Sequence, residues 1–497
     1  MNQRFIVLIC CLLTLTFSNA QQDKNDDHFL RLVNILSIPN NANNISEIDS
    51  NINWLKKEFN SIGFETKTLK SKNNDLFFAS KFFSNNLPTV LFYMHFDGQP
   101  VDNSKWFQKN PYEPVLKYKK DEHEYESLKW EHIKFKNFNI EDIRIYARSA
   151  SDDKGPIAMF LSALHDINKQ GLIPEFNIKV ILDSEEEKGS PYLSVAVKEY
   201  RDVLNADYFV VFDGPMHDSG NPTLLFGVRG ITTLTMEVYG MYKPQHSGHY
   251  GNYGPNPVFR ASEIISSLKD GNGKVLVEGY YDGITFNEKT LSIMKHVPDD
   301  LEVLRHRAGF LYPEKAGNSY QEAIQFPSLN IRGIQSGWVG EESRTIVPDK
   351  VIVELDIRTV PESEPDELVR KLKQHISNLG YTFLNKRATK EDLLNINKPV
   401  FLTYRNEMFP FRTDFESIIG NWLRNSIKTT NKDIVHIRIS GGSVPLSFFI
   451  NELKVPTVLV PLVNPDNNQH SPNENLRLSN YFDGIETIKR IFTTPIN

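Results

Sequence analysis

The sequence has very little cysteine. Cys10 and Cys11 are the only two cysteines among 497 residues, and both lie in an apolar run near the N-terminus. The chain after residue 20 therefore cannot form a disulfide, hold a metal through thiolates or use a cysteine nucleophile. We expect its stability to come from core burial and from any bound metal.

Long apolar runs are also lacking after the first twenty residues, so no later segment is predicted to cross a membrane. Within those twenty residues, Arg4 precedes the apolar run Phe5–Phe17, and small residues follow it up to Ala20. This order is typical of a secretory signal peptide over residues 1–20. It predicts an exported protein, periplasmic or secreted, that is cleaved near Ala20. An uncleaved anchor is the alternative interpretation.

Positive charge is not concentrated in any one block. The formal net charge is -6, and the lysines are spread along the chain. A nucleic acid or an anionic membrane surface is therefore not expected as a partner. With 40% hydrophobic and 24% charged residues the composition is that of a globular protein, and the length predicts two or three domains of about 150 residues.

The first part of the chain alternates strand patterns with helical patterns. Thr89–Met94, Asn177–Leu182 and Tyr208–Phe212 are short apolar runs typical of buried strands, and Pro156–Lys169 has helical spacing that stops at Gly171. This alternation predicts an α/β domain whose mainly parallel sheet is covered by helices on both faces.

The pattern changes near Gly227. Thr232–Val238 and Val351–Ile357 alternate apolar with polar residues, as in strands that face water on one side, and Glu364–Leu379 is an amphipathic helix. These features predict a smaller α+β domain inserted into the larger one. The predicted boundaries are residues 21–226 and 393–497 for the larger domain and 227–392 for the inserted one.

Side chains able to bind metal follow the predicted strands. They are His95 and Asp97 after the first strand, Glu186 and Glu187 after the second, Asp213 after the third, Asp152 before the helix, and His470 after the apolar run Thr457–Val463. The carboxyl ends of strands in an open α/β sheet line the ligand crevice, so these side chains should converge. Two histidines and several carboxylates exceed the three ligands of one catalytic zinc, which favours two metals that share a carboxylate.

Each of these clusters has a simpler interpretation by itself. An acidic triplet such as Glu185–Glu187 is usually a solvated face, and acidic residues before a helix usually cap its N-terminus. Asp213 before Gly214 is compatible with a turn alone. The joint arrangement is what favours a metal centre.

Nine short stretches give the chain a recognisable signature: MHFDGQP, ASDDKGP, SEEEKGS, FDGP, QHSGHYGN, RTIVP, IRTVP, SGGSVP and QHSPNE. The sequence resembles the co-catalytic zinc peptidases, a family that includes carnosinases, cytosolic non-specific dipeptidase, aminoacylases and succinyl-diaminopimelate desuccinylase. The resemblance covers nearly the whole chain after residue 20 and is greatest to the carnosinase-like branch. It departs from the family where the usual Gly-Arg-Gly is Ala147-Arg148-Ser149, which removes no ligand.

The resemblance implies a pair of divalent metal ions, zinc or alternatively manganese or cobalt, with named ligands. His95 and Asp213 would hold one metal, Glu187 and His470 the other, and Asp152 would bridge them. Asp97 would orient His95, and Glu186 would be the general base that takes a proton from water and passes it to the leaving nitrogen. The Asp152–Asp153 peptide bond would be cis.

The inserted domain would be a ferredoxin-like lid and dimerisation domain. The resemblance implies that His246 reaches the active site of the partner subunit in a homodimer and stabilises the oxyanion. Thr345, Arg358 and Ser443 would contact substrate, with Arg358 as a bidentate clamp for a C-terminal carboxylate.

The expected function is that of an exported dizinc dipeptidase or carboxypeptidase acting on short peptides. An aminoacylase-type amidohydrolase acting on N-acyl amino acids is the alternative enzyme. A non-catalytic binding protein on the same fold is the alternative of another class.

Overall fold

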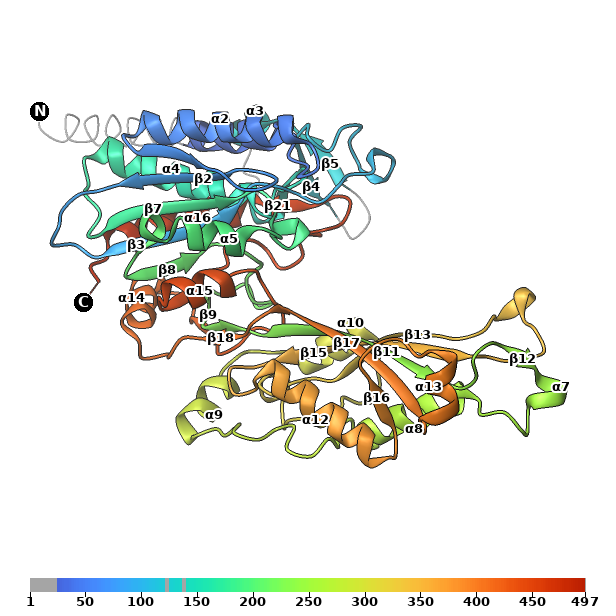
Figure 1. The fold of residues 1–497 in the computed structure, drawn as a ribbon. Coiled ribbons are helices and arrows are strands. Elements are labelled where there is room, and N and C mark those ends of the chain that lie inside the picture. Colours follow the sequence, from blue (N-terminus) through green and yellow to red (C-terminus); the bar gives the residue numbers. More distant parts are fainter. Residues whose placement is uncertain (1–24, 121–124, 136–139, 497) are drawn as a thin grey trace, which may run out of the picture. The chain divides into compact units, whose positions relative to one another are not determined.

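The computed structural model describes residues 25–120, 125–135 and 140–496. The chain divides into two compact units (Figure 1). The first unit comprises Met1–Phe226, Thr413–Val435 and Phe448–Asn497, and the second comprises Gly227–Arg412 and His436–Ser447. The predicted signal peptide lies outside the described residues. Within the described ranges, no helix has both the length and the apolar character needed to span a membrane.

An eight-stranded sheet forms the centre of the first unit, in the order β1-β2-β7-β3-β8-β20-β9-β19. Its four inner strands β7, β3, β8 and β20 are parallel, and β1 and β2 join antiparallel at one edge. This arrangement confirms the predicted mixed α/β fold class. The strands are β1 (Glu65–Leu69), β2 (Leu76–Lys81), β3 (Thr89–His95), β7 (Asn177–Asp183), β8 (Tyr208–Val211), β9 (Thr223–Leu225), β19 (Val435–Ile437) and β20 (Thr457–Leu459).

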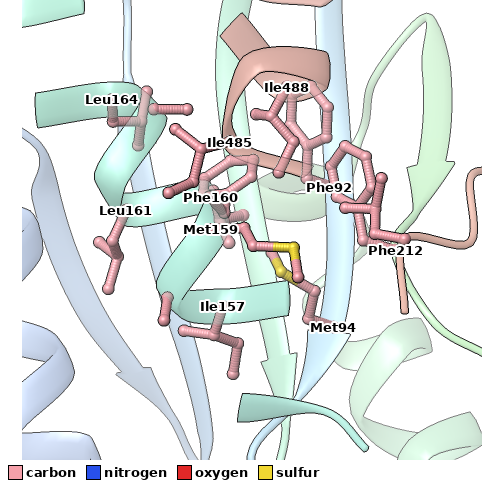
Figure 2. Close-up of a cluster of buried hydrophobic side chains, with 14 of the residues drawn as sticks. Phe92, Met94, Ile157, Met159, Phe160, Leu161, Leu164, Phe212, Ile485 and Ile488 are labelled. Atoms are coloured by element: carbon pink, nitrogen blue, oxygen red, sulfur yellow. The ribbon is translucent and has the colours of Figure 1, made fainter. Parts of the chain in front are cut away.

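Helix α4 (Lys154–Gln170) packs against β3 and against α16 (Leu478–Thr493), although more than 300 residues separate the two helices in the chain. Figure 2 shows the result: Phe92 and Met94 of β3 meet Phe160 of α4 and Ile488 of α16 in one buried cluster. Helix α4 ends at the predicted Gly171, which has a left-handed φ of 67°. The other helices, which lie largely in the first unit, are α2 (Ile45–Ser61), α3 (Trp130–Phe135), α5 (Leu193–Glu199), α6 (Arg201–Leu204), α14 (Ile418–Ile427) and α15 (Ser447–Leu453).

A smaller four-stranded sheet in the first unit has the order β21-β6-β4-β5. Its strands are β4 (Val115–Lys119), β5 (Tyr125–Leu128), β6 (Ile143–Tyr146) and β21 (Asn475–Arg477). The pairing of β6 with β21 joins two segments that are distant in the sequence: β6 precedes the loop that carries Asp152, and β21 follows the loop that carries His470.

The second unit is built on a five-stranded sheet with the order β13-β15-β11-β17-β16. One face of β11 and β15 packs with α8 and α12 around buried residues such as Leu234, Ile264, Val353 and Leu372. The strands are β11 (Gly230–Tyr239), β13 (Asn330–Gln335), β15 (Lys350–Thr359), β16 (Thr382–Leu384) and β17 (Pro399–Met408); the helices are α7 (Ser247–Tyr250), α8 (Pro257–Leu268), α9 (Glu288–Lys295), α10 (Leu301–Ala308), α11 (Tyr320–Ala323), α12 (Pro365–Asn378) and α13 (Lys390–Asn395). Two short pairs complete it, β10 (Gly227–Val228) with β18 (Phe411–Arg412), and β12 (Gln245–His246) with β14 (Ile346–Val347).

The second unit extends beyond the predicted boundary at residue 392. Strand β17 pairs with the central strand β11 from Val400 to Met408, so this part of the chain remains in the second unit. The segment His436–Ser447 also belongs to it, because Arg229 donates its backbone N–H to the carbonyls of Ser440 and Gly442. An apolar strand pattern does not state which sheet the strand will join, so the sequence placed these segments in the other domain.

Candidate metal centre

The centre is assembled where parallel strands of the first unit end. His95 is the last residue of β3 and lies opposite Asp183, the last residue of β7. The turn that carries Glu186 and Glu187 follows β7, and Asp213 follows β8 by two residues. Asp152 precedes α4. The strand ends therefore bring together side chains that are up to 118 positions apart, as the strand pattern predicted.

Two overlapping groups of possible metal ligands lie at this edge. One contains His95, Asp152 and Asp213, and the other contains Asp152, Glu187 and His470; within each group the ligand atoms lie within 4.8 Å of one another. Nε2 of His95 is 2.7 Å from Oδ1 of Asp152, whereas Nε2 of His470 is 3.0 Å from Oδ2 of Asp152 and 3.1 Å from Oε2 of Glu187. The two oxygens of Asp152 thus face different imidazoles.

Asp97 connects the two sides of the centre. It is fully buried, and its Oδ1 lies 3.3 Å from Nδ1 of His95. Its two oxygens also accept the backbone N–H groups of Glu186, at 3.1 Å, and Glu187, at 3.2 Å. One carboxylate therefore fixes both the imidazole ring and the turn that carries the two glutamates.

The structure separates the three glutamates of the acidic triplet. Glu185 turns to Asn73 and Lys188, with which its Oε1 forms hydrogen bonds of 3.3 and 3.2 Å. Glu187 joins His470, and its Oε2 accepts a 2.7 Å hydrogen bond from Gln99. Of the triplet, Glu187 contacts the centre directly through His470. Glu186 interacts electrostatically with His95, Asp213 and Asp152.

Acid groups dominate the electrostatics of the centre. Burial raises the pKa of Asp97 and of Asp213 to about 6, and burial together with neighbouring carboxylates raises the pKa of Glu186 well above its usual range. Hydrogen bonding to Asp152 raises the pKa of the His470 imidazole to about 10. The clustered carboxyls and imidazoles therefore fit a cationic occupant, and imidazole nitrogen with carboxylate oxygen is a donor set that zinc accepts.

Several residues in and around the centre were not assigned a role from the sequence. Asp153 accepts the backbone N–H of His95 through its Oδ2 at 3.2 Å, and Gln99 holds Glu187 as described. Glu474 binds the loop that carries Asp152. The Asp152–Asp153 peptide bond is cis, as the resemblance implied. The QHSPNE stretch contained the only signal for Glu474, since it places an acid four residues after His470.

The residues predicted to contact substrate or the oxyanion form two separate pairs in the second unit, and these include Ser443, which the sequence analysis placed in the larger domain. Nη1 of Arg358 donates to Oγ of Ser443 at 2.7 Å, and that hydroxyl donates to the carbonyl of Arg229 at 2.6 Å. His246 is exposed on β12, where the N–H of the next residue donates to the carbonyl of Thr345 at 3.0 Å. His246 and Thr345 thus lie side by side, in a different sheet from Arg358.

Comparisons with known proteins agree with this geometry. The model of peptidase family M20/M25/M40 matches residues 91–494. The Cys-Gly metallodipeptidase DUG1 of Candida albicans is 26% identical over 80% of this chain and 77% of its own, and the Beta-Ala-His dipeptidase of Homo sapiens is 25% identical over 81% of this chain and 74% of its own. The crystal structure of an M20 family metallo-carboxypeptidase, Sso-CP2 from Sulfolobus solfataricus, superimposes with a TM-score of 0.73 at 26% identity over 94% of this chain and 98% of that one.

The family match covers the strands and loops that carry all the candidate metal ligands, from His95 to His470. It confirms the resemblance that the short stretches indicated. The chain belongs to peptidase family M20/M25/M40 and is a metallopeptidase.

Proposed function

We propose that this metallopeptidase is a dizinc dipeptidase or carboxypeptidase that hydrolyses short peptides. The observation that carries the proposal is the sharing of Asp152 between two ligand groups, since a carboxylate common to both groups suits a pair of metals. Support for the substrate class comes from the relatives, which are named as a Cys-Gly metallodipeptidase and a Beta-Ala-His dipeptidase.

In this proposal His95 and Asp213 would hold one metal, Glu187 and His470 would hold the other, and Asp152 would be a ligand common to both sites. A pair of zinc ions, when bound, would lower the pKa of a water molecule and would stabilise the negative charge that develops on the carbonyl oxygen of the scissile amide. Asp97 keeps the His95 ring in orientation through Nδ1, which is the usual way of fixing a ligating imidazole.

Glu186 is the proposed general base. Burial, and after it the neighbouring carboxylates, raises the pKa of Glu186. A raised pKa favours uptake of a proton from the attacking water, which the residue would then pass to the leaving nitrogen. Asp97 fixes the backbone of Glu186 and so sets where the carboxylate can reach. Arg358, held by Ser443, is the proposed clamp for the substrate's C-terminal carboxylate.

The second unit is proposed to serve as lid and dimerisation domain. In a homodimer, His246 would stabilise the oxyanion at the partner's site, and Thr345, which is adjacent to it, would contact the same substrate. Export after cleavage near Ala20 completes the proposal. A fully active monomer in solution would remove His246 from the mechanism, and retention of residues 1–20 in the mature protein would contradict export.

The test combines metal analysis with one variant. Purified protein is expected to contain about two equivalents of zinc. Glu186→Ala is expected to keep this zinc and to lose about 10²–10⁴-fold in turnover. Substantial residual turnover in this variant would reject Glu186 as the base.

The substrate class is tested on the same preparation. Dipeptides with a free C-terminus and N-acyl amino acids are compared by kcat/KM. Preference for the dipeptides is expected. A clear preference for N-acyl amino acids would replace the proposal with an aminoacylase-type activity, and no turnover of either with two zinc ions bound would favour a binding protein.

A further inference from the structure

A buried carboxylate that the proposed mechanism does not use contacts the loop that carries Asp152. Glu474 has no exposed surface. Its Oε1 accepts the backbone N–H groups of Ser151 and Asp152 and the Ser151 hydroxyl, all at 3.0 Å. Its Oε2 accepts the N–H of Ser149 at 2.9 Å and the guanidinium of Arg148 at 2.7 Å. Within the segment 148–152, only Ala150 makes no hydrogen bond to this side chain.

These bonds explain how a carboxylate can remain buried there. Burying a charge is costly unless the charge is paired and its hydrogen-bonding capacity is satisfied. Arg148 is itself 3% exposed and lies with its guanidinium 5.2 Å from the ring centre of Trp106. The two buried charges compensate each other, and the three backbone donors and the Ser151 hydroxyl satisfy the remaining hydrogen-bonding capacity of Glu474.

Glu474 belongs to the loop that presents His470. Its carbonyl accepts the N–H of Ala147 at 3.2 Å, next to the pairing of Asn475 with Tyr146 in β21 and β6. Both the N–H and the side-chain amide of Asn475 donate to the carbonyl of Asn467, which closes the loop around His470. His470 itself has a left-handed φ of 61°, a conformation that a non-glycine residue keeps only when its surroundings hold it.

We infer that Glu474 is a positioning residue for the metal centre, which fixes the backbone of the Asp152 loop and locks it to the loop of His470. The inference rests on the proposed two-metal site. Asp152 and His470 meet at one group of ligand atoms, so a loop shift that separated them would open that group. A role in fold stability alone is the competing explanation, and it predicts no specific effect on metal binding.

The test measures metal affinity and fold stability separately. Zn²⁺ is titrated calorimetrically into the metal-free full chain, against a competing chelator, for the wild type and for Glu474→Gln. The matched control is Glu237→Gln, because Glu237 is also a buried carboxylate, 2% exposed, that binds Tyr239, Lys350 and Arg387 in the second unit. Urea denaturation of the same metal-free samples reports their stability.

We expect Glu474→Gln to weaken Zn²⁺ binding by about 10-fold to 100-fold, the usual effect of removing a group that orients a ligand. Glu237→Gln should lower stability and leave Zn²⁺ affinity unchanged. Wild-type affinity in Glu474→Gln, with stability lowered as in the control, would overturn the inference. A wild type that binds no zinc pair would instead reject the proposed function.

A second variant decides the matter if Glu474→Gln does not fold. Ser151→Ala removes one of the hydrogen bonds to Glu474 and leaves the charge pair with Arg148 in place. A smaller loss of Zn²⁺ affinity in the same direction is expected. Unchanged affinity in this variant would overturn the inference.

Discussion

The metal-free protein is expected to become less stable as the pH rises from about 5 to about 7. Burial raises the pKa of Asp97 and of Asp213 from 3.8 to about 6. A carboxyl with a raised pKa in the folded state stabilises the fold while it is protonated, and this contribution is lost as the pH rises through the folded pKa. A bound cation favours the carboxylate form, so metal-loaded protein should not show the loss.

The size of the effect follows from the two pKa values. One pKa unit corresponds to about 1.4 kcal/mol, so a shift of about two units contributes about 3 kcal/mol per group well below pH 4. Between about pH 5 and pH 7 a group with a pKa of about 6 releases its proton and loses about half of that contribution, roughly 1.4 kcal/mol. Asp97 and Asp213 together should therefore lower the free energy of unfolding by about 3 kcal/mol over this range.

Urea denaturation followed by tryptophan fluorescence, in chelator and in zinc at several pH values, measures this change. Carboxyls with a lowered pKa do not interfere; the neighbouring His165, with Nε2 3.5 Å from Oε2 of Glu58, lowers the pKa of Glu58, for example, so that group titrates below its ordinary 4.5. Asp97→Asn removes one of the carboxyls whose raised pKa produces the slope and should give a shallower slope in chelator. A metal-free protein whose stability is flat or rises between pH 5 and 7 would refute the reasoning.

Three further substitutions test other parts of the structure. Arg358→Lys removes the forked guanidinium donor that now bonds to Ser443. It should raise KM about tenfold for dipeptides and have little effect on analogues whose C-terminal carboxylate is capped as an amide. An equal effect on both substrates would contradict the role of Arg358 as a carboxylate clamp. Phe160→Ala removes a fully buried ring whose centre lies 5.2 Å from that of Phe92. It should lower the free energy of unfolding, measured by urea titration, by about 3–5 kcal/mol. A loss below about 1 kcal/mol would show that the cluster around Phe92 and Phe160 is not the core of the first unit. Ser149→Gly should change the free energy of unfolding by less than about 1 kcal/mol. Relief of the strain at the left-handed φ of 61° offsets loss of the hydrogen bond that Asn40 donates to the Ser149 hydroxyl. A large loss of stability in urea titrations would show that this hydrogen bond outweighs the strain.

Local patterns predicted the elements of the fold closely. The strand over Thr89–Met94 extends to His95, and the helix predicted to stop at Gly171 ends there. Periodicity and glycine placement act over a few residues, so they are visible in a single sequence. The end of the second unit was not visible, since the sheet that receives β17 is decided by pairing with β11, more than 160 residues earlier.

The candidate ligands could also be named in advance, because imidazole and carboxylate at the ends of predicted strands indicate a metal site and the short stretches indicate a family. The residue types alone did not show which glutamate of the triplet turns away; only the family resemblance assigned roles to Glu186 and Glu187 and none to Glu185. The bonds of Glu185 to Asn73 and Lys188 decide that, and Asn73 comes from a distant part of the chain.

The sequence by itself thus determined the residue types available for chemistry, the alternation of helix and strand, and, through the lack of cysteine after residue 20, the absence of thiolate ligands from this part of the chain. The tertiary structure decided which carboxylate both ligand groups share, which one orients His95, and that Glu474 is enclosed against the loop of Asp152. The physical reason is range: propensity and periodicity are local, whereas burial, shared hydrogen bonds and the raised pKa values of a carboxylate cluster arise only when distant segments of the chain come into contact.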